Sequence, residues 1–204
     1  MQIKDPSKIL KTGTTTIGLI IKNGVILATE SQATAGYYVA TKRANKLFKL
    51  MNNMGITISG GVADCQNLVR LLQALLRLRE LELEKDVPVS SAVALLSSLM
   101  FQRRYFPYYS MLVMGGVDEE GPQIYSMDFF GSILKEENFV GVGSGSVMAI
   151  GVLEADWKED LTEEEGIELA KSAIESARRR DSASGGKLQL AVIDKEGFRW
   201  VEKI

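Results

Sequence analysis

Strand-like and helix-like segments follow one another in groups along this sequence, and their order limits the possible folds severely. Four short strand-like segments come first and two helical segments follow. Three strands, two helices and two closing strands complete the chain. A parallel sheet needs a crossover, usually a helix, between successive strands, so helices grouped in pairs indicate antiparallel sheets. We therefore expect an α+β fold in which helices lie outside layered antiparallel sheets.

The expected strands are short and are bounded by turn residues. Asn23-Gly24 is a strong hairpin signal between the first two strands, and Lys195-Glu196-Gly197 marks the turn between the last two. The strands are expected at Thr14–Lys22, Gly24–Thr29, Leu47–Met51, Gly55–Ser59, Ser110–Val117, Gln123–Met127, Ile133–Val140, Leu188–Ile193 and Phe198–Val201.

Apolar residues repeat at helical spacing in the segments between these strands. Pro88 separates the first two helices, and Ser90 or Ser91 is the expected N-cap of the second. Thr162 and Glu165 form an expected capping box at the start of the fourth helix. The first helix is expected from about Ala63 to Glu84, with one face made of Leu68, Leu71, Leu72, Leu75 and Leu76. The third is expected between the Gly/Ser turn at 141–146 and about Ala155.

The amino-acid composition excludes several classes of catalytic site and metal site. The chain has no histidine, which excludes Ser-His-Asp and Cys-His catalysis and histidine-ligated zinc. Its single cysteine, Cys65, excludes an internal disulfide and a cysteine-rich metal site, and it suits a reducing cytoplasm. The Gly141–Ser146 turn lacks the Lys-Ser/Thr of a phosphate-binding loop. We therefore expect no metal and no cofactor.

Charge and hydropathy argue against two kinds of partner. With 24 basic and 26 acidic residues the net charge is −2, which gives no electrostatic case for nucleic acid or an anionic membrane. The charge-free stretch Asn138–Leu153 is interrupted by glycines and serines, so it does not predict a transmembrane helix. Residues 1–13 carry three lysines and do not read as a signal peptide.

A hydrolase without histidine needs another proton acceptor. An α-amino group has an ordinary pKa of about 7.7–8.0, closer to neutrality than that of lysine. A hydroxyl nucleophile paired with its own free α-amine is an established catalytic solution. Gly13-Thr14 offers such a position where the lysine-rich lead meets the first strand, because glycine leaves room for the Thr14 hydroxyl to attack the preceding carbonyl. The alternative is that these threonines simply begin a strand.

Further motifs accompany this position: TTTIG at Thr14–Gly18, ILATE ending at Glu30, Lys46-Leu47-Phe48, ITISGGVAD at Ile56–Asp64, GVGSGS followed by GVLE, and RRDSASGG at Arg179–Gly186. In this order and spacing they resemble the catalytic β subunits of archaeal proteasomes, which are N-terminal-nucleophile threonine peptidases. The resemblance implies a four-layer αββα sandwich of two antiparallel sheets flanked by helices. It also implies that residues 1–13 are a propeptide removed by self-cleavage and that residues 14–204 are one catalytic domain.

The resemblance implies roles for three residues at the reacting centre. Thr14 would supply the nucleophilic oxygen and, once freed, the basic amine. Lys46 would lower the pKa of the hydroxyl or amine, and Glu30 would hold Lys46 in place. One residue departs from the family pattern, because Gln32 stands where arginine is common; we expect this change to leave Lys46 less firmly held.

The resemblance also implies the surroundings of the reacting centre. Asp181, Ser144 and Ser184 would orient and enclose the amine, and the backbone N–H of Gly60 would form the oxyanion hole. The expected pocket for the substrate side chain is wholly apolar and consists of Ala33, Ala44, Ile58 and Val62. Such a pocket predicts cleavage after hydrophobic residues.

The implied partners are other β subunits in heptameric rings, rings of α subunits, a regulatory ATPase and unfolded polypeptide substrates, all in the cytoplasm. Three alternatives stay open at this point. The chain is a non-catalytic or weakly active structural β subunit of a mixed ring, a superfamily member that cleaves a small-molecule amide, or a plain binding domain.

Overall fold

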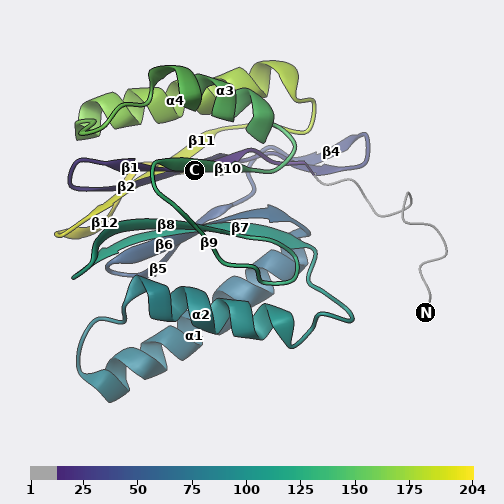
Figure 1. Ribbon diagram of the computed structural model, residues 1–204. Helices are drawn as coiled ribbons and strands as arrows, with labels where there is room; N and C mark the ends of the chain where they lie inside the picture. The colour runs from purple at the N-terminus through teal and green to yellow at the C-terminus, as the bar shows by residue number, and fades with distance from the viewer. Residues whose placement is uncertain (1–12) are drawn as a thin grey trace.

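The computed structural model describes residues 13–204, and these residues form four stacked layers (Figure 1). Two helices cover the outer face of each of two five-stranded sheets, and the sheets face one another in the middle. The helices are α1 (Val62–Leu83), α2 (Val89–Phe101), α3 (Ser146–Asp156) and α4 (Glu163–Arg180). The predicted α+β sandwich is therefore confirmed. Apart from Gly13, the predicted propeptide lies outside the described residues.

Every strand pairing in the described part of the chain is antiparallel. The first sheet has the order β10-β1-β2-β11-β12, and the second has the order β5-β6-β7-β8-β9. The strands of the first sheet are β10 (Phe139–Val142), β1 (Thr16–Ile21), β2 (Gly24–Glu30), β11 (Leu188–Asp194) and β12 (Gly197–Glu202). Those of the second are β5 (Leu47–Met51), β6 (Met54–Gly60), β7 (Ser110–Asp118), β8 (Gly121–Met127) and β9 (Leu134–Glu136).

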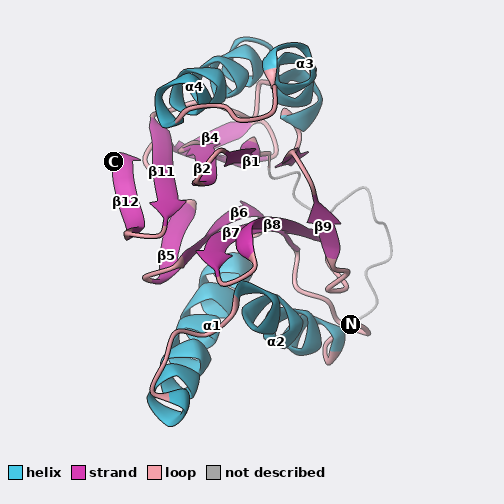
Figure 2. Ribbon diagram, turned by 60° about the vertical axis from the view of Figure 1, so that its left-hand side comes forward, coloured by secondary structure: helices cyan, strands magenta, loops and turns pink. Residues whose placement is uncertain are grey.

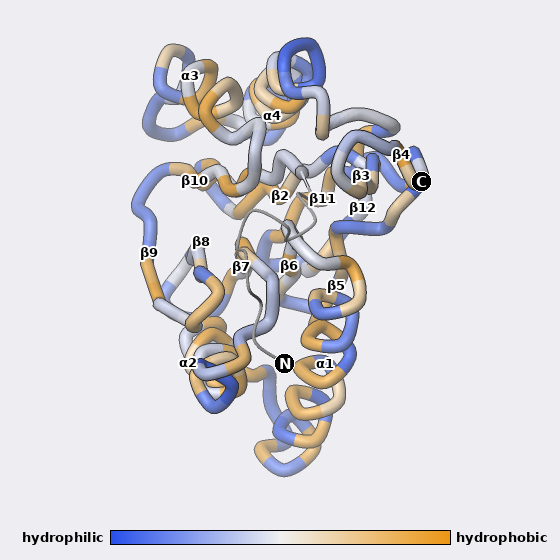
Figure 3. The backbone as a smooth tube through the Cα atoms, turned by 90° about the vertical axis from the view of Figure 1, so that its right-hand side faces the viewer, coloured by the Kyte–Doolittle hydropathy of each residue, from blue (hydrophilic) through white to orange (hydrophobic). Residues whose placement is uncertain are grey.

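Three apolar cores hold these four layers together. One core lies between α3, α4 and the first sheet, a second lies between the two sheets, and a third lies between the second sheet and α1 with α2. Hydrophobic and hydrophilic residues alternate along the helices in Figure 3, as expected for helices with one buried face. In α1 that face is narrower than predicted, because Leu68, Leu72 and Leu76 are buried whereas Leu71 is exposed.

Two strand predictions need correction. A short hairpin, β3 (Ala33–Ala35) and β4 (Tyr38–Thr41), was not predicted, because it is only partly buried and shows little alternation of polarity. The single strand expected at Ile133–Val140 is two strands that belong to different sheets. β9 pairs with β8, whereas β10 pairs with β1, so this segment passes from one sheet to the other.

The helix starts agree with prediction in one case and not in another. The capping box of α4 is present, since Thr162 Oγ1 accepts from the Glu165 N–H at 3.2 Å and Glu165 Oε2 accepts from the Thr162 N–H at 3.0 Å. Neither Ser90 nor Ser91 caps α2, which begins at Val89 without a side-chain cap from its N-cap residue. The Asp118 carboxylate accepts from the Val89 N–H at 2.8 Å instead.

Among residues 13–204, no helix is long and apolar enough to cross a membrane. The same residues include no group of three or more acidic or cysteine side chains arranged to hold a metal ion.

Candidate active site

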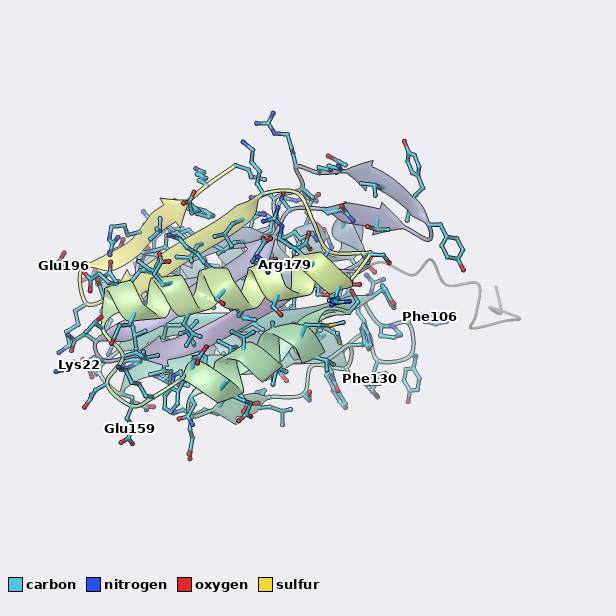
Figure 4. The ribbon with its side chains drawn as sticks, turned by 90° about the horizontal axis from the view of Figure 1, so that it is seen from above. Lys22, Phe106, Phe130, Glu159, Arg179 and Glu196 are labelled. Atoms are coloured by element: carbon cyan, nitrogen blue, oxygen red, sulfur yellow. The ribbon has the colours of Figure 1, made fainter. Side chains whose placement is uncertain are left out.

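Strand direction brings the predicted reacting residues to one end of the sandwich. Thr14 lies just before β1, and Glu30 ends the neighbouring strand β2, which runs antiparallel to β1. Lys22 lies after the far end of β1, and Figure 4 shows it at the opposite end of the molecule from Phe106 and Phe130. Thr14 therefore lies at the end where these two exposed phenylalanines are found.

Lys46 joins this pair from the second sheet. It stands immediately before β5, and its Nζ donates a hydrogen bond to Thr14 Oγ1 at 2.9 Å. The same ammonium forms an ion pair with Glu30. The Thr14 hydroxyl in turn donates to the carbonyl oxygen of Gly13 at 2.7 Å. All three side chains are buried, with exposed fractions of 3 % for Thr14, 3 % for Lys46 and 0 % for Glu30.

Burial shifts both members of the ion pair toward their neutral forms. Loss of solvent raises the pKa of the Glu30 carboxyl, and the nearby Lys46 charge works against this shift. Loss of solvent likewise lowers the pKa of the Lys46 ammonium, and the Glu30 carboxylate opposes it. The paired form is thus held by mutual attraction in a site that disfavours either charge alone.

Main-chain N–H groups hold the second oxygen of the Glu30 carboxylate. Glu30 Oε2 accepts from the Gln32 N–H at 2.6 Å and from the Gly185 N–H at 2.9 Å. The Gln32 side chain makes other contacts, donating to Thr34 Oγ1 and to the Ser182 carbonyl, each at 3.1 Å. The bonds that brace Glu30 therefore do not depend on which side chain stands at position 32.

A hydrogen-bonded network surrounds the Thr14 nitrogen. The Thr14 N–H donates to Ser144 Oγ at 3.2 Å, and Ser144 Oγ donates to Asp181 Oδ2 at 2.6 Å. Ser184 Oγ donates to the same carboxylate oxygen at 2.6 Å and lies 2.7 Å from Thr15 Oγ1. Asp181, at the C-terminal end of α4, thus reaches Thr14 through Ser144 rather than directly.

A small hollow opens beside Thr14 and Lys46 and is lined by most of the predicted pocket residues. Its walls are Gly13, Thr14, Ala33, Thr34, Lys46, Ile58, Gly60 and Val62. Ala44 is not among them; its N–H donates to the Ser31 carbonyl. The volume of the hollow is about 20 Å³, which is room for roughly one water molecule.

Gly60 needs to be glycine at this hollow. Its φ is +123°, and a Cβ there would lie 2.3 Å from the Tyr109 carbonyl oxygen. The single cysteine, Cys65, is buried in the core under α1. Burial raises the pKa of its thiol to about 12, so Cys65 does not compete with Thr14.

Two buried residues to which the sequence analysis gave no role also contact this site. Thr15 lies beside Ser184, and Gln189 contacts the main chain of Lys46. The available signal for Gln189 was a lone amide in the otherwise apolar run Leu188–Ile193. A buried amide requires hydrogen-bond partners, so such a residue indicates a polar contact in the core.

The αββα sandwich, with Thr14 at the head of a central strand, has the fold of the N-terminal-nucleophile hydrolases. The sequence pattern of the family described as "Proteasome subunit" matches residues 10–193.

Proteins named "Proteasome subunit beta" are similar to this chain along most of its length. The one from Methanoregula boonei is 45 % identical over 192 residues, covering 94 % of this chain and 90 % of its own. That from Methanoculleus marisnigri is 46 % identical over 194 residues, covering 95 % and 91 %. That from Archaeoglobus profundus is 44 % identical over 186 residues, covering 91 % and 86 %. The chain belongs to the proteasome subunit family.

Proposed function

We propose that the chain is a threonine endopeptidase subunit of a proteasome core particle, with Thr14 as the N-terminal nucleophile of its mature form. The observation that carries this proposal is the 2.9 Å hydrogen bond from Lys46 Nζ to Thr14 Oγ1, inside a buried ion pair with Glu30. Burying a lysine–carboxylate pair has a large desolvation penalty. Here the lysine also donates a hydrogen bond to the hydroxyl of Thr14, just before β1.

Maturation begins with an attack by Thr14 Oγ1 on the carbonyl carbon of Gly13. The C–N bond between Gly13 and Thr14 breaks, the nitrogen gains a proton, and an ester forms between Gly13 and the Thr14 oxygen. Water then hydrolyses the ester, which releases residues 1–13 and leaves the Thr14 amine free. The hydroxyl already lies against Gly13, because it donates to the Gly13 carbonyl oxygen at 2.7 Å.

Peptide hydrolysis then uses the same oxygen. The free Thr14 amine takes the hydroxyl proton as Oγ1 attacks the substrate carbonyl, while the Lys46 ammonium stabilises the negative charge that develops on Oγ1. The amine passes its proton to the leaving nitrogen as the C–N bond breaks, which leaves a threonyl ester. Water cleaves this ester and regenerates Thr14. Ser144 and Asp181 hold the amine in this scheme, and the Gly60 N–H receives the substrate oxyanion.

The hollow beside Thr14 is proposed to become the pocket for the substrate side chain. Gly13 is part of its wall, so release of residues 1–13 enlarges it. The apolar side chains of Ala33, Ile58 and Val62 support cleavage after hydrophobic residues. The shared family supports assembly into rings with further β and α subunits in the cytoplasm, where an ATPase delivers unfolded polypeptides.

Replacement of the nucleophile tests this proposal. The chain and the Thr14→Ala and Thr14→Ser variants are produced with the partner α subunit. Intact mass then reports removal of residues 1–13, and fluorogenic peptides ending in Leu, Tyr, Glu and Arg report hydrolysis. Thr14→Ala is expected to keep the lead segment and lose hydrolysis, whereas Thr14→Ser keeps part of both activities. Unchanged hydrolysis by Thr14→Ala overturns the proposal, and an inert, unprocessed wild-type chain favours a structural β subunit.

A further inference from the structure

Gln189 is a fully buried amide near the start of β11. Its neighbours Leu188 and Leu190 pack into the core under α3 and α4. Because side chains alternate along a strand, Gln189 faces the other way, as do Ala191 and Ile193 in the core between the sheets. A buried amide is costly unless both its oxygen and its nitrogen are hydrogen-bonded, so its partners identify what it holds.

Both ends of this amide bind main-chain groups that flank Lys46. Gln189 Oε1 accepts from the Lys46 N–H at 3.1 Å and from the Leu47 N–H at 3.4 Å. Gln189 Nε2 donates to the Ala44 carbonyl at 3.0 Å and to the Glu30 carbonyl at 3.5 Å. The Gln189 side chain therefore forms hydrogen bonds with the backbone on both sides of Lys46 and with the backbone of Glu30, the ion-pair partner of the lysine.

These bonds cross from one sheet to the other. Thr14 lies just before β1 and Glu30 ends β2, both strands of the first sheet, whereas Lys46 lies immediately before β5, the edge strand of the second sheet. Figure 2 shows β5 beside β11 and β12 at this edge. Apolar packing between the sheets is non-directional. It can set the distance between the sheets, but it does not fix the position of one ammonium group. Hydrogen bonds have defined distances and angles, so those to the Lys46 backbone can fix the position of the lysine.

Precision at this point matters for the proposed chemistry. The Lys46–Thr14 contact is a single hydrogen bond of 2.9 Å, and a misplacement of about 1 Å in a reacting centre costs on the order of 100-fold in rate. The Lys46 carbonyl accepts from the Ile58 N–H of β6 at 2.9 Å, which holds the lysine within its own sheet. Among the hydrogen bonds of residues 13–204, only those of Gln189 connect the Lys46 backbone to the first sheet, next to which Thr14 lies.

We propose that Gln189 is a positioning residue, which sets the Lys46 ammonium against the Thr14 hydroxyl by holding the lysine backbone. This inference rests on the proposed function, because only a lysine that acts in catalysis needs such exact placement. Gln189 is not part of the hollow beside Thr14, so it acts through Lys46 and Glu30.

The first test is Gln189→Leu, which removes both hydrogen-bonding groups at similar size. We expect kcat per processed chain to fall roughly 10- to 100-fold while KM stays within about twofold. Intact mass gives the fraction of processed chains, so poor assembly or slow maturation does not count as lost activity. The matched control is Gln123→Leu on β8, a glutamine that is 1 % exposed and bonds to Asp118 and Tyr125. Its kcat per processed chain is expected to stay within about twofold of wild type.

The second test is Gln189→Glu, which keeps the size and shape of the side chain. A neutral carboxyl group both accepts and donates as the amide does, whereas an ionised one cannot donate to the Ala44 carbonyl. The activity of Gln189→Glu relative to wild type is therefore expected to fall as pH rises. Lys46 and Glu30 are the titratable neighbours and are common to both proteins, so the ratio isolates the new carboxyl group.

A residue that only stabilised the fold would change the yield of particles but not this ratio. Equal kcat per processed chain for Gln189→Leu and wild type, with a pH-independent ratio for Gln189→Glu, overturns the positioning role and leaves the Thr14→Ala result standing. If Thr14→Ala leaves hydrolysis unchanged, both proposals are overturned together.

Discussion

Lys46 Nζ donates a hydrogen bond to Thr14 Oγ1 over 2.9 Å, although 32 positions separate the two residues in the sequence. Thr14 precedes a strand of the first sheet and Lys46 precedes a strand of the second. The contact therefore exists only when the two sheets are packed together. Folding of the sandwich and assembly of the candidate active site are the same event.

Replacement of Lys46 by methionine is expected to abolish activity and to weaken the fold. Loss of the ammonium removes the charge that stabilises the Thr14 oxygen, so kcat should fall about 100-fold or more. It also leaves Glu30 buried without its partner, and breaking a buried pair in this way costs about 3–5 kcal/mol. Peptide hydrolysis and the thermal unfolding midpoint measure the two effects.

The two effects separate in the double variant Lys46→Met/Glu30→Gln. A glutamine at position 30 keeps an oxygen to accept from the Gln32 and Gly185 N–H groups but carries no charge. Thermal stability should therefore return toward wild type while activity stays absent. Recovery of activity in the double variant would show that Lys46 does not act on Thr14.

The Thr14 amine and the two buried charges together set the pH dependence of kcat. Catalysis needs Lys46 protonated, and burial lowers the pKa of its ammonium below 10.5, so activity should decline before the pH reaches that value. On the acid side, catalysis needs the Thr14 amine unprotonated, and the ordinary pKa of an α-amine is about 7.7–8.0. It also needs Glu30 ionised, and burial raises the pKa of that carboxyl above 4.5, so both groups remove activity well above pH 4.5. Turnover at saturating peptide is measured across this range on intact particles. A rate that stays constant through pH 10.5 contradicts the assigned role of Lys46.

Gly13→Ala is expected to block removal of the lead segment. A Cβ at position 13 would lie 1.9 Å from Ala183 Cβ and 2.7 Å from Ser144 Oγ, so the cleavage site must shift. Intact mass should show residues 1–13 still attached. Adding Ala183→Gly removes the nearer obstacle and should restore part of the processing, whereas Ala183→Gly alone should be processed like wild type. Full processing of Gly13→Ala would argue against this geometry.

Ser144→Ala is expected to lower kcat by at least about 10-fold, because the Thr14 nitrogen loses its partner and its link to Asp181. Ser182→Ala is the matched control, since Ser182 is an exposed serine directly after Asp181. It should keep near-normal kcat. Equal rates for both variants would remove Ser144 from the proposed scheme.

Most of the fold was predictable because it depends on local patterns. The Asn23-Gly24 signal and the apolar periodicity of the helices are short-range patterns. The structure has the expected hairpin, although its two turn residues are Lys22 and Asn23 and Gly24 already pairs with Ile21. The hairpin of β3 and β4 was not predicted, because its strands are short and partly exposed. The break between β9 and β10 was not predicted, because the change of sheet depends on pairing with β1, a strand far away in the sequence.

Thr14 was indicated by the Gly13-Thr14 position in a chain without histidine, but the rest of the candidate site was predictable only through family resemblance. No local pattern relates Thr14 to Lys46 or to Asp181, since their proximity arises from the packing of two sheets and the end of α4. Gln189 escaped even the resemblance, because its importance lies in which backbone groups it meets across the sheets.

The most direct measurement is the intact mass of this chain in assembled particles that hydrolyse peptides. The account predicts a chain that lacks residues 1–13 and begins with a free amine at Thr14. Active particles whose chains still carry residues 1–13 would contradict it, because the Thr14 nitrogen would then be an amide with no basicity.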